Sequence, residues 1–151
     1  MQALYFAYGS NLCASRLRGR IPSAVVVERA RLPGRRLVTD KLGRDGSGKA
    51  NLREDAAATV WSVIYEIHST HWAELDACER GYSRVSLEVV TEAGVRLLAQ
   101  TYVSETLTAD PVPYAWYKRL VIEGAREHGL PADYVAMLEV WPEKPDPAGP
   151  G

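Results

Sequence analysis

The 151-residue chain has few of the residues that mark several common classes of protein. Its two cysteines, Cys13 and Cys78, are too few for a disulfide framework or a zinc-ligand pattern. Three histidines, at positions 68, 71 and 128, show no metal-ligand spacing. The sequence therefore predicts no metal site, and its cysteine usage favours a reducing compartment, for which the cytoplasm is the ordinary expectation.

A strong charge of one sign and a long hydrophobic run are also lacking. Eighteen Lys and Arg against 19 Asp and Glu give a formal net charge of −1, which argues against a general binder of nucleic acid or of anionic membranes. No apolar stretch is long enough to span a bilayer, and the N-terminus lacks the basic segment of a signal peptide. The length and a hydrophobic share of 46% are typical of one soluble globular domain with a core.

The predicted elements run from strands through a short helix and a hairpin to helices. Hydrophobic patterns predict strands over 3–7, 24–31, 35–39, 59–67, 82–91 and 95–104, and helices over 12–18, 71–78, 113–128 and 132–140. Asn11 is a candidate N-cap for the first helix, and Pro33-Gly34 a turn between two strands. We expect a single α+β domain over residues 1–140 with a largely antiparallel sheet or barrel. The proline-rich remainder, 141–151, is predicted to be a flexible tail.

The first candidate site is the stretch Tyr8–Leu12, YGSNL, which follows the first strand. Gly9 lets the chain turn, and a helix is expected to begin at Asn11 or Leu12. Backbone N–H groups at a helix start lack internal partners and lie at its positive end, so they suit a carboxylate or a phosphate. The residues alone leave open whether this is an anion-binding loop or only a tight turn with a cap.

The second candidate is Glu79, at the end of the predicted helix 71–78. The negative end of a helix and partial burial beside Trp72 and Tyr82 would both raise the pKa of its carboxyl group, as suits a general acid or base. Glu74 and Asp76 lie nearby, however, so a solvated glutamate remains an alternative from the residues alone.

A third stretch, Gly43–Ala50, nearly matches the phosphate-binding pattern G-x-x-x-x-G-K-[ST]. Ala50 stands where a hydroxyl should hold magnesium, and a strand is predicted to follow instead of a helix. A nucleotide-binding protein that uses Gly43–Lys49 is therefore the weaker of the alternatives.

Six segments occur in the order seen in the gamma-glutamylcyclotransferase-like family, which the chain resembles from residue 4 to about 140. They are Tyr8–Leu12 (YGSNL), Gly48–Leu52 (GKANL), Val60–Ile67 (VWSVIYEI), Leu75–Glu79 (LDACE), Tyr82–Val89 (YSRVSLEV) and Tyr117–Pro131 (YKRLVIEGAREHGLP). The pairing of Y-G-S-N with a later L-D-x-x-E carries the resemblance.

The resemblance implies a small mixed barrel flanked by helices, and an enzyme that converts a gamma-glutamyl amide to 5-oxoproline and a free amine or amino acid without a cofactor. It implies Glu79 as the catalytic acid/base and a small-molecule partner only. The implied substrate-binding residues are Tyr8, Gly9, Ser10, Asn11, Leu12, Tyr82 and Tyr117.

Two departures from the family pattern bear on the substrate. Arg80 stands between Glu79 and Gly81, where many relatives have glycine directly after the glutamate, and Ser62 occupies a position where glycine is frequent. The leaving group stays open, because the family includes enzymes for gamma-glutamyl amino acids, gamma-glutamyl-lysine-type amines and antibiotic intermediates. A non-catalytic module that binds a small carboxylate is the main alternative, and no oligomeric state is predicted.

Overall fold

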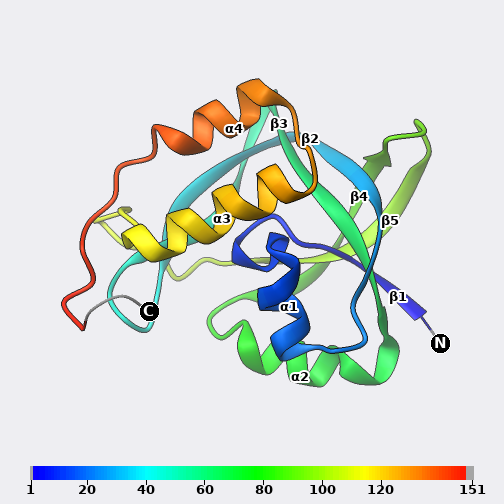
Figure 1. Ribbon diagram of the computed structural model, residues 1–151, viewed down its shortest axis with the longest axis horizontal. Coiled ribbons are helices and arrows are strands. Elements are labelled where there is room, and N and C mark those ends of the chain that lie inside the picture. The colour runs from blue at the N-terminus through cyan, green and yellow to red at the C-terminus, as the bar shows by residue number, and fades with distance from the viewer. Residues whose placement is uncertain (1, 149–151) are drawn as a thin grey trace.

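The computed structural model describes residues 2–148, in which five strands form a closed barrel in the order β1-β3-β2-β4-β5. The strands are β1 (Gln2–Phe6), β2 (Val25–Leu42), β3 (Gly48–His68), β4 (Ser83–Thr91) and β5 (Arg96–Val103). Neighbouring strands are antiparallel except β1 and β5, which meet in parallel at Tyr5 and Gln100 and close the barrel. The predicted α+β class with a small mixed barrel is confirmed (Figure 1).

Strands β2 and β3 form a long hairpin. Two separate strands joined by a turn at Pro33-Gly34 were predicted where β2 runs, and that prediction is wrong. The chain continues as one strand, and the register with β3 shifts between Pro33 and Arg35. Gly34 has a φ of +83°, which an L side chain rarely adopts. The turn-prone pair therefore makes a β-bulge, which bends and twists the strand without ending it.

Of the four α-helices described, α4 begins where the sequence pattern predicted, and the other three begin one or two residues later. They are the 3-10 helices η1 (Ser10–Leu12) and η2 (Ser69–His71), and the α-helices α1 (Ala14–Arg20), α2 (Trp72–Cys78), α3 (Ala115–Glu127) and α4 (Ala132–Glu139). The prediction that Asn11 caps the first helix is wrong, because Cys13 holds the cap position of α1. The tight turn of η1 precedes that cap and leaves the Asn11 side chain for a different contact. None of the helices within residues 2–148 is long and apolar enough to cross a membrane.

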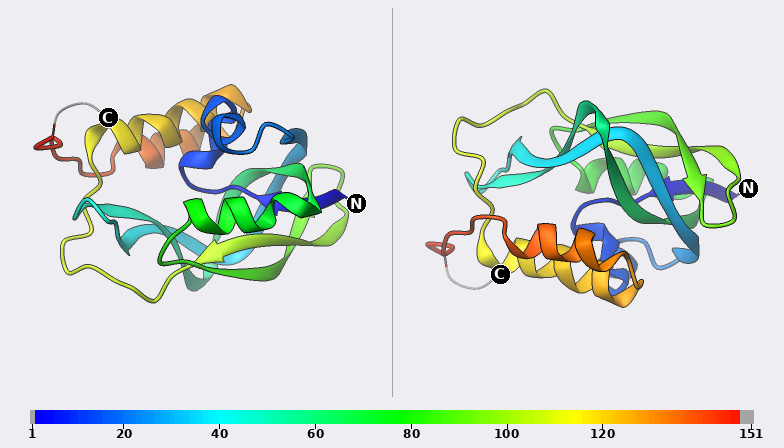
Figure 2. Two further views of the ribbon diagram at one scale, coloured as in Figure 1. Left: turned by 90° about the horizontal axis from the view of Figure 1, so that it is seen from below. Right: turned by 90° about the horizontal axis from the view of Figure 1, so that it is seen from above.

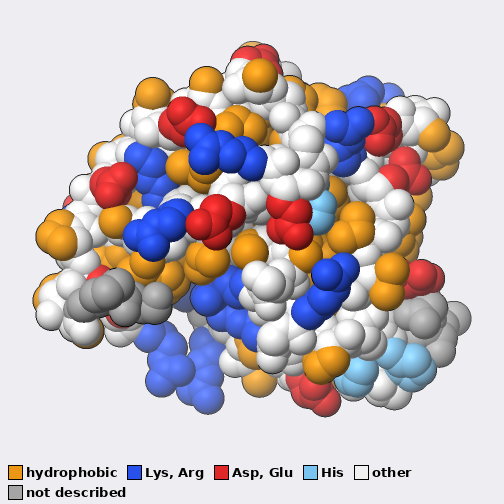
Figure 3. Space-filling model, viewed as in Figure 1, with side chains coloured by type: hydrophobic (Ala, Val, Ile, Leu, Met, Phe, Trp, Pro, Cys, Tyr) orange, Lys and Arg blue, Asp and Glu red, His pale blue; other side chains and the backbone are white. Residues whose placement is uncertain are grey.

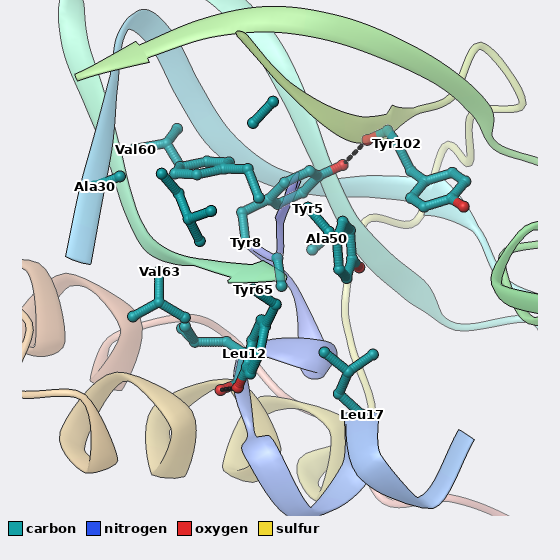
Figure 4. Packing of buried hydrophobic residues seen from close by; sticks show 14 of the residues in the cluster. Tyr5, Tyr8, Leu12, Leu17, Ala30, Ala50, Val60, Val63, Tyr65 and Tyr102 are labelled. Atoms are coloured by element: carbon teal, nitrogen blue, oxygen red, sulfur yellow. Dashed lines mark hydrogen bonds between the residues drawn. The ribbon is translucent and has the colours of Figure 1, made fainter. Parts of the chain in front are cut away.

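Helix α3 packs directly on the first loop. A side chain at Gly124 would meet backbone atoms of Leu12 and Cys13 at 2.6 Å, so the absence of a Cβ there permits the approach. Helix α4 lies beside α3 on the same side of the barrel (Figure 2). The core between barrel and helices contains Tyr5, Tyr8, Leu12, Val63 and Tyr65. In Figure 4 the Tyr8 hydroxyl reaches the carbonyl of Tyr102, and the Tyr65 hydroxyl reaches that of Leu12 at the opposite end of the cluster.

The tail after α4 has irregular structure as far as residue 148, and it contacts the start of α3. The N–H of Ala115 donates to the carbonyl of Lys144 at 3.0 Å, and the Trp116 indole donates to Asp146 at 2.9 Å. These bonds hold the segment 141–148 against the start of α3. The predicted flexibility of the tail stays a prediction, and residues 149–151 lie outside the described residues.

Candidate active site

A narrow polar cavity of about 30 Å³ lies where β1, β3, β5, α2 and α3 meet. It is lined by the first loop, by one glutamate and by hydroxyl groups, from Tyr5, Tyr8, Gly9, Ser10, Asn11, Ala50, Glu79, Tyr82, Thr101, Tyr102 and Tyr117. Glu79 and six of the seven residues proposed to bind substrate therefore come together. Leu12 does not line the cavity. It is fully buried in the core, and its N–H donates to the carbonyl of Gly9.

The first loop is held at both ends by hydrogen bonds to its backbone. Before it, the hydroxyl of Ser62 donates to the carbonyl of Ala7 at 2.5 Å. After it, the Leu12 carbonyl accepts from the Tyr65 hydroxyl at 3.1 Å (Figure 4). The same carbonyl accepts from Nε2 of His128 at 2.8 Å. The serine that departs from the family pattern thus has a partner, and the loop is positioned before any ligand arrives.

The backbone amides of this loop are only partly used. Those of Leu12 and Cys13 donate to the carbonyls of Gly9 and Ser10. The amides of Gly9 and Asn11 have no backbone partner within residues 2–148. Donors of this kind beside a cavity suit a carboxylate oxygen or a developing oxyanion.

Glu79 is the C-cap residue of α2, directly after Cys78, and its side chain points into the cavity with 16% of its surface exposed. Its Oε1 accepts from Nδ2 of Asn11 at 2.7 Å, and a guanidinium nitrogen of Arg20 lies 3.8 Å from the same oxygen. The other oxygen, Oε2, has no hydrogen-bond partner in the described part of the chain. One oxygen is therefore fixed and the other is free to exchange a proton.

Burial raises the pKa of the Glu79 carboxyl group above its ordinary value. The positive charges of Arg20, Arg16 and Lys41 oppose that shift, as does the hydrogen bond from Asn11. Burial beside aromatic side chains, one of the two causes anticipated from the sequence, is thus the dominant one.

The tyrosines around the cavity are uncharged at neutral pH. Burial raises the pKa of Tyr5, Tyr8 and Tyr82 well above its ordinary value, and raises the pKa of Tyr117 to about 12. Their hydroxyl groups therefore donate and accept hydrogen bonds without adding charge. Glu79 is the one carboxylic acid among the residues described as lining the cavity.

The wall beside Gly9 of the loop is made by Ala50, at another register shift of the long hairpin. Ala50 has no partner in the β2–β3 ladder, where the register shifts between Val38 and Lys41. Its N–H donates instead to the hydroxyl of Tyr117 at 3.0 Å, and its carbonyl accepts from the hydroxyl of Tyr82 at 2.6 Å. The bulge thus turns one residue of a barrel strand toward the site.

Comparison with known proteins agrees with this arrangement. The model of the AIG2-like family matches residues 59–138. Gamma-glutamylcyclotransferase from Bos taurus is 32% identical over 144 residues, which is 89% of this chain and 76% of the relative. The Mus musculus protein of the same name is 32% identical over 145 residues, or 90% of this chain and 77% of the relative.

The chain belongs to this gamma-glutamylcyclotransferase-like (AIG2-like) enzyme family. A solved structure named gamma-glutamyl cyclotransferase superposes with a TM-score of 0.89 at 27% identity and covers 95% of this chain and 90% of its own. The resemblance noted in the sequence is confirmed, and so is the fold that it implied.

Sequence reasoning missed part of the gamma-glutamylcyclotransferase-like site. Tyr102 was not selected, yet its carbonyl accepts the hydroxyl of Tyr8 and its own hydroxyl donates to Asp76 at 2.6 Å. Sequence reasoning assigned Ala50 no place in the site, although it breaks a phosphate-binding pattern and belongs to the matching segment Gly48–Leu52. The excess of tyrosine over phenylalanine, eight against one, was the one available signal, because a tyrosine can pack in a core and still line a polar cavity.

The Gly43–Lys49 segment has the geometry of a hairpin loop. The amides of Gly43 and Gly46 bond within the loop, and that of Ser47 donates to the Asp45 carboxylate. The Lys49 ammonium lies 3.0 Å from the same carboxylate. Three of the loop amides and the lysine that a phosphate would need are therefore already occupied, which argues against the nucleotide-binding alternative.

Proposed function

We propose that the protein is a gamma-glutamyl cyclotransferase that releases 5-oxoproline and a free amine or amino acid from a gamma-glutamyl amide. The observation that carries the proposal is the Glu79 carboxyl group, buried in an otherwise uncharged cavity with one oxygen held by Asn11. Its neighbours are the loop amides and tyrosine hydroxyls that a small zwitterionic substrate would need.

The substrate is proposed to bind with its glutamyl part in the narrow cavity. Its α-carboxylate would accept from the free amides of Gly9 and Asn11, and its chain would fold against the tyrosine rings. This places the α-amine near the γ-carbonyl of the same molecule, so that the ring closure is a reaction between groups already held together. Leu12 would act by shaping the loop from the core side.

In the reaction the α-nitrogen forms a bond to the γ-carbonyl carbon, and the bond from that carbon to the amide nitrogen breaks. Overall, two protons leave the attacking nitrogen, which starts as an ammonium group, and two reach the leaving nitrogen. A single carboxyl group can carry them in turn, and Oε2 of Glu79 is the proposed carrier. The raised pKa suits this role, because it brings the carboxyl closer to the pH of the reaction. No step needs a metal or an organic cofactor.

The test is release of 5-oxoproline from a panel of gamma-glutamyl amino acids and gamma-glutamyl amines, measured by chromatography. We expect turnover of at least one member, unchanged by a chelator. Binding of the panel without any 5-oxoproline would contradict the proposal and favour the non-catalytic carboxylate-binding module. The two free cysteines, Cys13 and Cys78, fit a reducing compartment, and a cytoplasmic location is proposed on that basis.

A further inference from the structure

A wider groove of about 600 Å³ adjoins the narrow cavity. The two share Ser10, Glu79, Tyr82 and Tyr117 in their linings. If the glutamyl part occupies the cavity, the other side of the scissile amide must extend past Glu79 into this groove. The groove is therefore where the leaving group lies.

Positive charge is concentrated in the groove, although the whole chain has a formal net charge of −1. Among residues 2–148, the carboxylates that line it are those of Asp45 and Glu79. The basic residues of its lining are Arg16, Arg20, Lys41, Arg44, Lys49 and Arg80. Figure 3, which has the same view as Figure 1, shows Lys and Arg side chains gathered at the lower left of the molecule.

Four of these cations have no carboxylate partner in the described part of the chain. Lys49 is paired with Asp45, and Arg20 lies within 4 Å of Glu79. No acidic group lies within 4 Å of the other four in residues 2–148, and they are Arg16, Lys41, Arg44 and Arg80. Elsewhere most basic side chains of the described chain do have such a partner, so the groove differs from the rest of the surface.

Two of the four are held in place by the protein. Nε of Arg16, on α1, donates to the Ser10 hydroxyl at 2.9 Å. Nζ of Lys41, at the end of β2, donates to the carbonyl of Arg80 at 2.7 Å and lies 4.7 Å from the centre of the Tyr82 ring. Arg16 therefore lies on the side of Glu79 that faces α1. Lys41 lies on the other side, against the turn that contains Arg80. Burial lowers the pKa of both groups, since an uncompensated charge is costly away from water.

We propose that the groove selects gamma-glutamyl substrates whose leaving group carries two carboxylates, as an acidic amino acid does. This rests on the proposed function. A neutral amino acid would bring one carboxylate to a groove with unpaired cations on two sides, and an uncharged or cationic amine would bring none. Arg80, which stands between Glu79 and Gly81, supplies one of these cations and is assigned as a specificity residue.

The experiment compares three substrates that differ only in the leaving group: gamma-glutamyl-glutamate, gamma-glutamyl-glutamine and gamma-glutamyl-lysine. We expect kcat/KM for the glutamate compound to exceed that for its glutamine isostere by roughly tenfold at about 10 mM salt, with the lysine compound slowest. The ratio should approach one at about 1 M salt, where charges in an open groove are screened. A ratio of one or less at low salt, or a ratio indifferent to salt, would overturn the inference.

Matched variants locate the effect. Arg80→Gln and Arg44→Gln should each lower the glutamate-to-glutamine ratio by roughly threefold, as expected for one partly exposed ion pair. Arg119→Gln is the control, because Arg119 is exposed on α3 and does not line the groove. An unchanged ratio in both groove variants would overturn the assignment. Turnover of the glutamine compound without preference for the glutamate compound defeats this inference alone, whereas no 5-oxoproline from any of the three defeats the proposed function with it.

Discussion

The narrow cavity and the wider groove share Glu79 but differ in nearly every other property. The cavity is lined by neutral tyrosines, by the backbone of Ala50 with both of its groups bonded, and by the amides of Gly9 and Asn11. The groove is open, carries six basic side chains and has partners for only some of them. A buried neutral lining tunes the pKa of one carboxyl group, whereas an open charged lining tunes which molecules approach it. The two regions therefore separate the chemistry from the choice of leaving group, and mutations can test that separation.

The largest effect is expected at Glu79, the carboxyl group that lines both regions. Glu79→Gln should lower kcat by roughly 10²–10⁴-fold while substrate binding stays nearly intact, because glutamine keeps the shape but cannot carry a proton. Single-turnover formation of 5-oxoproline together with calorimetric binding measures both. Glu74→Gln is the matched control, since Glu74 is exposed at the start of the same helix. Turnover of Glu79→Gln close to that of the unmodified protein would end the acid/base assignment.

The second prediction concerns the tyrosines of the cavity. Tyr117→Phe removes the acceptor of the Ala50 N–H, and a buried donor left unpaired costs about 1–3 kcal/mol in the free energy of unfolding. Tyr82→Phe is the companion variant, which removes the donor to the Ala50 carbonyl and should cost less, because a carbonyl lacking a partner is better tolerated. Urea denaturation of both variants checks the order. Equal stability of all three proteins would show that the Ala50 contacts do not hold the cavity wall.

The third prediction tests how the groove acts on the cavity. Of the positively charged groups that lower the pKa of Glu79, Arg20 has the largest effect. In Arg20→Gln that pKa should rise further, so the acid limb of the kcat/KM profile should move to higher pH. The same profile for Arg119→Gln should not move. A limb that stays in place in Arg20→Gln would mean that another group controls it.

The smallest effect is expected in how the free energy of unfolding depends on pH. Since the pKa of Glu79 is raised in the folded protein, the folded state retains a proton that the unfolded chain has lost as the pH rises above the ordinary value of 4.5. Stability therefore falls with rising pH from there to the raised pKa. Glu79→Gln lacks this penalty, so its free energy of unfolding relative to the unmodified protein should rise over that window and then level off. Denaturation series from pH 4 to pH 8 measure the difference, and a variant that becomes relatively less stable as pH rises would contradict it.

Much of the site was predictable because its two anchors are ends of elements. The glycine-led turn after β1 and the glutamate before Gly81 are local features. Gly81 has a φ of +82°, and the glycine there indicates where α2 must stop. Predictions of how the side chains and strands interact were less secure. Asn11 was expected to cap a helix but binds Glu79 instead, and Pro33-Gly34 was expected to end a strand but makes a bulge.

The sequence by itself determined the order of elements, the barrel-and-helix class and the glutamate that belongs beside the first loop. Only the tertiary structure decided that Ala50 turns its backbone to Tyr82 and Tyr117, that Tyr102 joins the cavity, and that basic residues from α1, β2, the hairpin loop and the turn after α2 line one groove. The physical reason is that turns, caps and alternation depend on residues a few positions apart. The cavity wall depends on the strand register, and the charge of the groove depends on which distant segments fold together.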